Sequence, residues 1–140
     1  MIDLSAWAEA IENALAEQSH CIVASANREG YPDAAPKGSM MVLDKEHLAW
    51  WERSRGEQLG QIEENPRVAV YYRNAARKLM VRFYGEATIY PDGPIRDQVM
   101  ARTPQIELDA DPERKGLAVV LRIDRVRVSR NTVQQRDAVS

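Results

Sequence analysis

Residues 36–70 read PKGSMMVL, DKEH, LAWWERS and RGEQLGQIEENPRVAV, one piece directly after the other. The first and third pieces have the composition of β-strands, and DKEH between them is a turn. The fourth piece repeats apolar residues at helical spacing until Asn65-Pro66, where a helix must stop before the next strand begins. The stretch therefore predicts strand, turn, strand, helix and strand in that order.

The start of the expected helix is the first candidate binding feature. Ser54 can accept a hydrogen bond from the third amide of the helix, and Glu57 can reach back, which together form a capping box. A helix N-terminus offers free amides and partial positive charge, so it can hold a phosphate, here with help from Arg53, Arg55 and Lys37. The alternative is that Ser54 and Glu57 only cap the helix and the basic side chains are solvated.

Outside this stretch the chain is rich in strand patterns. Helices are expected over residues 4–18 and from Pro94 to Arg102, an exposed acidic loop over residues 104–112, and a frayed polar tail after Asn131. The apolar residues of the last strand change parity, which predicts a β-bulge near Asp124 and Arg125. Six strands in total predict a small antiparallel barrel; they are expected over residues 20–26, 31–43, 48–53, 68–72, 79–90 and 117–128.

Size and composition limit the class of protein. A chain of 140 residues with 44% hydrophobic and 29% charged residues is expected to form one domain over residues 1–140. A net charge of −2 argues against a general nucleic-acid footprint, and the apolar runs are too short for a bilayer. With a single cysteine and no signal-peptide pattern, a cytoplasmic location is expected.

Several other chemistries lack support in the sequence. His20 and His47 have no cysteine or carboxylate partners at ligand spacing, so no metal site is expected. Cys21 lies in an apolar strand and is interpreted as a small buried residue rather than a nucleophile. Trp50 and Trp51 are neighbours on one strand, so only one can point into the barrel, and the other can meet a ligand or a partner subunit.

The ordered pieces of residues 36–70, the IEENPRVAV signature and the later MVRFYGEA strand resemble the pyridoxamine 5'-phosphate oxidase-like family over roughly residues 20–130. The resemblance implies a six-stranded antiparallel split β-barrel with flanking short helices. It also implies a homodimer that binds FMN, or in some branches the deazaflavin F420 or haem, in clefts between the subunits.

The resemblance carries a set of cofactor-binding residues onto this sequence. They are Lys37, Gly38, Ser39, Glu52, Arg53, Ser54, Gln58 and Arg82. Many relatives have a basic residue, followed by Lys, Thr or Ser, to hold the FMN phosphate where this chain has Glu57 and Gln58. A carboxylate within a few ångströms of a phosphate repels it by roughly a few kcal/mol.

The function expected from these residues is a flavin-binding oxidoreductase that acts on a small planar substrate, with the flavin ring performing the redox chemistry. No catalytic side chain is assigned. The chain lacks counterparts of the substrate-binding arginine and histidine of true pyridoxamine phosphate oxidases, so oxidation of vitamin B6 is not expected. Because of Glu57 and Gln58, the alternative is a non-enzymatic or FMN-independent ligand-binding barrel.

Overall fold

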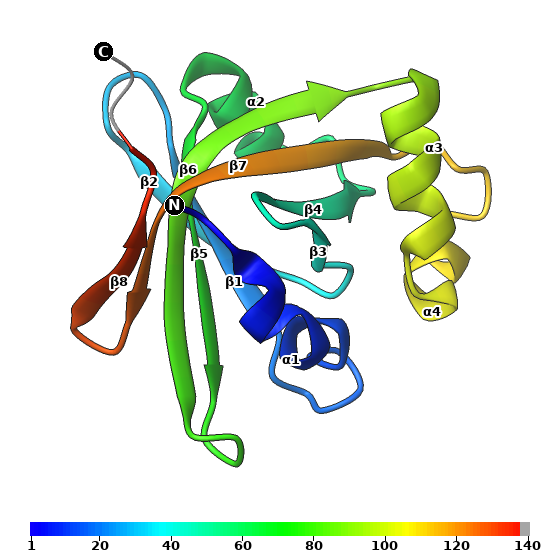
Figure 1. Cartoon of the computed structure of the whole chain (residues 1–140). Coiled ribbons are helices and arrows are strands. Elements are labelled where there is room, and N and C mark those ends of the chain that lie inside the picture. The colour runs from blue at the N-terminus through cyan, green and yellow to red at the C-terminus, as the bar shows by residue number, and fades with distance from the viewer. Residues whose placement is uncertain (138–140) are drawn as a thin grey trace.

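A computed structural model describes residues 1–137, which form one antiparallel sheet with short helices around it (Figure 1). The strands are β1 (Cys21–Ala26), β2 (Pro32–Lys37), β3 (Met41–Asp44), β4 (His47–Glu52), β5 (Arg67–Asn74), β6 (Leu79–Tyr90), β7 (Leu117–Val128) and β8 (Asn131–Gln135). The helices are η1 (Leu4–Trp7), α1 (Ala8–Glu12), α2 (Glu57–Glu64), α3 (Gly93–Arg102) and α4 (Gln105–Asp109). No helix within these residues is long and apolar enough to span a bilayer.

The strand order makes this sheet a split barrel. It runs β2-β1-β5-β6-β7-β4-β3, and β8 adds to β7. The edge strands β2 and β3 are consecutive in sequence, so residues 38–40 carry the chain from one edge of the sheet to the other. Within the described residues no backbone ladder joins these two edges, and the sheet is not closed. The expected split-barrel fold with short flanking helices is confirmed.

The sequence predicted six strands, whereas the described residues form eight. The expected strand over residues 31–43 is broken at residues 38–40, because β2 pairs with β1 whereas β3 pairs with β4. The expected frayed tail instead contains β8, which the Gln134 side chain ties to both backbone groups of Asp3 at 2.8 Å. The last three residues of that tail, 138–140, lie outside the described residues.

The predicted bulge in the last strand is confirmed. Tyr84 pairs with Arg125 and Gly85 pairs with Ile123, so Asp124 is the extra residue of β7. The extra residue restores inward facing on both sides of the bulge, since Ile123 and Val126 are both fully buried.

The helix expected over residues 4–18 is shorter than predicted. Its first turn is the 3₁₀ helix η1, and α1 ends at Glu12. The Asn13 side chain donates to the Glu9 carbonyl at 2.9 Å and so competes with the backbone at the position where the helix ends. The short segment still covers the barrel, because Trp7 packs edge-on against Phe83 with ring centroids 5.7 Å apart.

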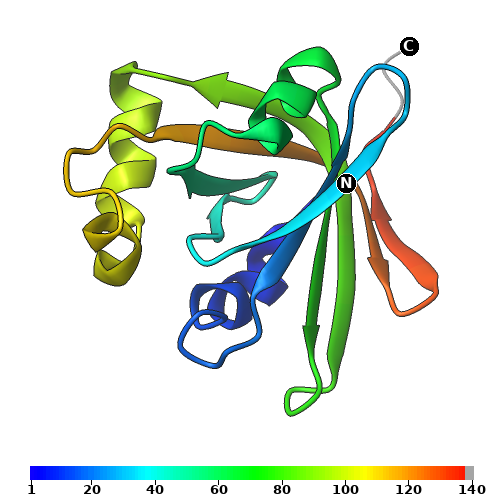
Figure 2. The same ribbon diagram turned by 180° about the vertical axis from the view of Figure 1, so that it is seen from behind.

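The segment between β6 and β7 covers one end of the barrel, as Figure 2 shows from behind. The expected helix from Pro94 to Arg102 is confirmed as α3. The expected exposed loop over residues 104–112 is wrong in part, because it contains α4 and the buried Asp111. Asp111 is buried because it accepts hydrogen bonds from the amides of Lys115 and Gly116 and from the indole of Trp51.

Candidate functional site

Six of the predicted site residues lie together around one cavity of about 160 Å³. Three lie at the end of β2 and in the crossing that follows it, and three lie at the end of β4 and directly after it; they are Lys37, Gly38, Ser39, Glu52, Arg53 and Ser54. The Ser39 hydroxyl holds the two segments together, since it accepts from the Trp51 amide at 2.9 Å and donates to the Trp51 carbonyl at 3.1 Å. Buried Ser39 therefore shapes the cavity, and its hydroxyl is already hydrogen-bonded to the backbone.

Lys37 and Glu52 form a buried ion pair at the centre of this site. The Lys37 ammonium lies 2.9 Å from Glu52 Oε1, and the two side chains are 13% and 4% exposed. Glu52 Oε1 also accepts a hydrogen bond from Trp50 Nε1 at 3.0 Å. The charge of Lys37 is thus neutralised within the protein.

Glu107 of α4 is a wall of the cavity that the sequence analysis did not assign. Its carboxylate packs directly on the backbone at Gly38, where a Cβ atom would lie only 2.9 Å from Glu107 Cδ. Glu107 Oε2 also lies 3.9 Å from Arg53 Nε, and the Arg53 side chain is half exposed. The only sequence signal was the cluster of acidic residues in this segment, which does not say which carboxylate turns inward.

The start of α2 differs from the predicted capping box. The helix begins at Glu57, Gly56 is its extended N-cap residue, and no side chain within residues 1–137 caps it. Because Ser54 lies two residues before the N-cap, its hydroxyl is too early in the chain to serve the role assigned to it. The first amides of α2 are therefore not occupied by a side chain.

A second cavity of about 260 Å³ adjoins the first at the start of α2. The two cavities share Lys37, Glu52 and Ser54, and the second adds Asp33 and the first residues of α2. We call these two cavities together the crossover site.

Gln58, the seventh predicted site residue, lines the second cavity. Its side-chain amide is buried and donates to the Val23 carbonyl on β1 at 2.9 Å. Gln58 Oε1 has no hydrogen-bond partner among the described residues. A buried acceptor without a donor is costly to leave unsatisfied, so this position favours a hydrogen-bond donor.

Arg82, the eighth predicted residue, lies elsewhere. Its guanidinium is 4.9 Å from the centre of the Tyr71 ring and donates to the Ser129 carbonyl at 3.3 Å. Arg82 lines neither cavity of the crossover site. The structure of one chain thus brings together seven of the eight predicted residues and leaves Arg82 on another face.

The two tryptophans point to opposite faces of β4, as the alternation of side chains along a strand predicts. Trp50 points into the barrel and is fully buried, whereas Trp51 faces α3 and lines the smaller cavity. The Trp51 ring is clamped by the Arg96 guanidinium, 4.8 Å from its centre, and by Asp111, which accepts from its indole at 3.0 Å. Burial would raise the pKa of Asp111, but its hydrogen bonds from two backbone amides and the indole hold that pKa below its ordinary value.

Cys21 is fully buried, as predicted, and burial raises the pKa of its thiol to about 12. The thiol is therefore protonated at neutral pH. Within residues 1–137, no group of three or more His, Cys, Asp or Glu side chains is placed to share a metal ion.

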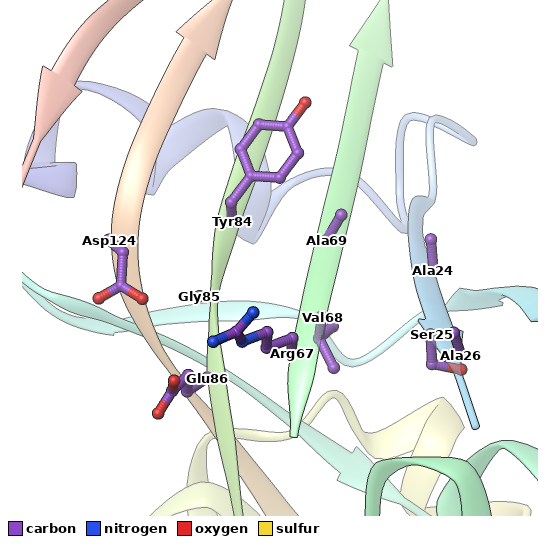
Figure 3. A pocket seen from close by; sticks show the side chains of 10 residues that line it. All are labelled: Ala24, Ser25, Ala26, Arg67, Val68, Ala69, Tyr84, Gly85, Glu86 and Asp124. Atoms are coloured by element: carbon purple, nitrogen blue, oxygen red, sulfur yellow. The ribbon is translucent and has the colours of Figure 1, made fainter. Parts of the chain in front are cut away.

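A groove of about 500 Å³, larger than either cavity of the crossover site, lies on the outer face of β1, β5, β6 and β7. Its floor is made of small residues that include Ala24, Ala69 and Gly85. Figure 3 shows the Tyr84 ring toward one end of the groove and Arg67 toward the other. The groove could not be predicted from the sequence, because strand alternation marks a face of a sheet but not its curvature.

An open antiparallel barrel with this strand order belongs to the split-barrel class, and here its polar cavities lie where β2 and β4 end near the start of α2. The chain belongs to the pyridoxamine 5'-phosphate oxidase family, whose sequence model matches residues 7–130. The predicted family is thereby confirmed. No curated protein sequence matches the chain.

Solved structures share the same fold. A candidate pyridoxamine 5'-phosphate oxidase from Lactobacillus delbrueckii is 27% identical, with 91% of this chain and 99% of that chain covered and a TM-score of 0.67. An FMN-binding protein from Syntrophomonas wolfei is 11% identical, with 91% and 88% covered and a TM-score of 0.67. An F420 reductase is 20% identical, with 82% and 94% covered and a TM-score of 0.61. The last two similarities concern the fold alone.

Proposed function

We propose that this protein binds an isoalloxazine cofactor, FMN or a close analogue, at the crossover site and acts as an oxidoreductase on a small planar substrate. The observation that carries the proposal is the convergence of residues 37–39 and 52–54 on one cavity in a chain of this family. Structural neighbours that include an FMN-binding protein and an F420 reductase support the same class of cofactor.

The residues of the crossover site fit the two ends of FMN unequally. The uncapped amides at the start of α2 can serve the uncharged polar groups of a flavin. The phosphate end fits poorly, because Lys37 is paired with Glu52 and because Glu57 is the first residue of the helix. The flavin ring itself supplies hydride or electron transfer, so the role proposed for these side chains is to bind and orient it.

A titration tests this function. FMN added to the purified protein is expected to show saturable quenching of its fluorescence, with flavin absorbance bands retained on the protein. Arg53→Ala, which changes an exposed side chain of the cavity, is expected to weaken FMN binding several-fold. Arg28→Ala, an exposed arginine on the β1–β2 hairpin, is the matched control and should bind as the wild type does. No quenching by any flavin or deazaflavin would contradict the proposal.

A second candidate function is favoured by Glu57 at the start of α2. A barrel that has replaced a phosphate-binding residue by a carboxylate could bind another ligand, such as haem, without flavin chemistry. The absorbance spectrum of the purified protein separates the two functions, because a haem band in place of flavin bands would favour the second.

We also propose that the protein is a homodimer that pairs through the outer face of β1, β5, β6 and β7. This face carries the 500 Å³ groove and two tyrosines stacked under arginines, Tyr71 under Arg82 and Tyr84 under Arg125. Arginine and tyrosine are enriched at protein interfaces. In such a dimer Arg82 is proposed to serve the crossover site of the partner subunit, which would account for its separation from the other seven residues.

Light scattering tests the dimer. At micromolar concentration the mass is expected to be that of two 15.9 kDa chains. Ala69→Arg, which places a long charged side chain on the floor of the groove, should shift the mass toward one chain. Ala101→Arg, the same change on an exposed position of α3, should leave the dimer intact. A monomeric wild-type protein would contradict this assembly.

A further inference from the structure

We propose that the crossover site discriminates against a phosphate dianion at the start of α2 and takes a neutral hydroxyl-bearing chain there, so that this barrel prefers the dephosphorylated flavin, riboflavin, to FMN. The proposal rests on the flavin-binding function proposed above and specifies the form of the cofactor. Three features of the site support it.

The first feature is that Lys37 is already neutralised. Its ammonium group is 2.9 Å from Glu52, and both side chains are largely buried. A phosphate could recruit Lys37 only by separating this pair, which would leave the Glu52 carboxylate buried without its cation. Lys37 therefore does not act as a free phosphate ligand.

The second feature is the balance of charge around the two cavities. Four carboxylates line them but only two cations, and the cations are Lys37 and Arg53. Arg53 in turn lies 3.9 Å from Glu107. The two remaining carboxylates, Asp33 and Glu57, line the same cavity as the start of α2. They repel a phosphate dianion but not a neutral group.

The third feature is the kind of hydrogen bonding that the site leaves open. The eight-residue helix α2 begins without a side-chain cap, so its first amides offer donors. Gln58 Oε1, on a side chain that lines the same cavity, is a buried acceptor without a partner in the described residues. A hydroxyl accepts from the free amides and also has a proton to donate, whereas a phosphate dianion only accepts.

Parallel titrations of the full-length protein with riboflavin and FMN, followed by flavin fluorescence, test the proposal. Riboflavin is expected to bind at least about ten-fold more tightly than FMN at low salt, because the repulsion between a phosphate and a carboxylate within a few ångströms is worth that factor or more. Added salt should narrow the difference by strengthening FMN binding alone, because salt screens the repulsion.

Glu57→Gln removes one carboxylate at constant size and should improve FMN binding several-fold, with little change for riboflavin. Glu63→Gln, an exposed glutamate near the other end of the same helix, is the matched control and should leave the ratio of the two affinities unchanged.

The possible outcomes separate this proposal from the one on which it rests. Equal affinities, or tighter binding of FMN, would overturn the preference and leave the flavin-binding function intact. If neither flavin binds, the flavin-binding function itself fails, and this proposal fails with it. Tighter binding of riboflavin together with the response to salt and to Glu57→Gln would support both.

Discussion

Replacing Gly85 by alanine is expected to destabilise the protein by about 3 kcal/mol or more. Gly85 pairs with Ile123 beside the bulge, and a Cβ atom there would overlap the carbonyl oxygen of Arg122 and lie 2.8 Å from its carbonyl carbon. The obstacle is backbone of a strand paired on both sides, so it cannot rotate away as a side chain could. Relief of the overlap requires β6 and β7 to separate at the bulge.

Urea unfolding, followed by tryptophan fluorescence, measures this effect. Gly60→Ala is the matched control, because Gly60 lies inside α2 and a Cβ atom there meets nothing within 4 Å. Alanine at position 60 should stabilise the protein by about 0.5–1 kcal/mol, since it favours the helix more than glycine does. A Gly85→Ala protein as stable as the wild type would show that the close approach of β6 and β7 is wrong.

Replacing Lys37 by methionine is expected to lower the free energy of unfolding by about 3 kcal/mol or more, because a buried carboxylate loses its cation. Glu52 is 4% exposed and would keep only its hydrogen bond from Trp50. The double variant Lys37→Met/Glu52→Gln should recover most of the loss. It removes both charges and keeps an acceptor for the Trp50 indole.

An exposed ion pair provides the control for this experiment. Lys115 lies 2.9 Å from Glu113, the same distance as in the Lys37–Glu52 pair, but both side chains are more than two thirds exposed. Lys115→Met should change the stability by no more than about 1 kcal/mol. If Lys37→Met and Lys115→Met have equal effects, the Lys37–Glu52 pair is not buried in solution. Lys37 would then be free to bind phosphate, as its position in the sequence predicts.

The sequence predicted the elements around residues 36–70 because their signals are local. The turn DKEH joins β3 to β4, and Asn65-Pro66 lies between the last residue of α2 and the first residue of β5. The parity change in the last strand was also sufficient to locate the bulge at Asp124. The break at residues 38–40 could not be predicted in this way. It depends on which neighbours β2 and β3 find in the sheet, and both halves have equally good strand composition.

The sequence predicted which residues line the site better than it predicted which contacts they make. The resemblance to the family selected residues 37–39 and 52–54, which converge on one cavity. It did not reveal that Lys37 is paired with Glu52, or that Glu107 covers Gly38. These contacts join residues that are 15 or more positions apart, and no local pattern records them.

By itself the sequence determined the order and type of most elements, the family, and the presence of Glu57 and Gln58 where relatives hold a phosphate. Those features follow from side-chain periodicity, turn residues and residue identity, which act over a few positions of the chain. Only the tertiary structure decided which charged side chains are paired and buried. Whether a lysine is free or neutralised depends on burial and on the partner that the fold places beside it, because the strength of an ion pair is set by its surroundings.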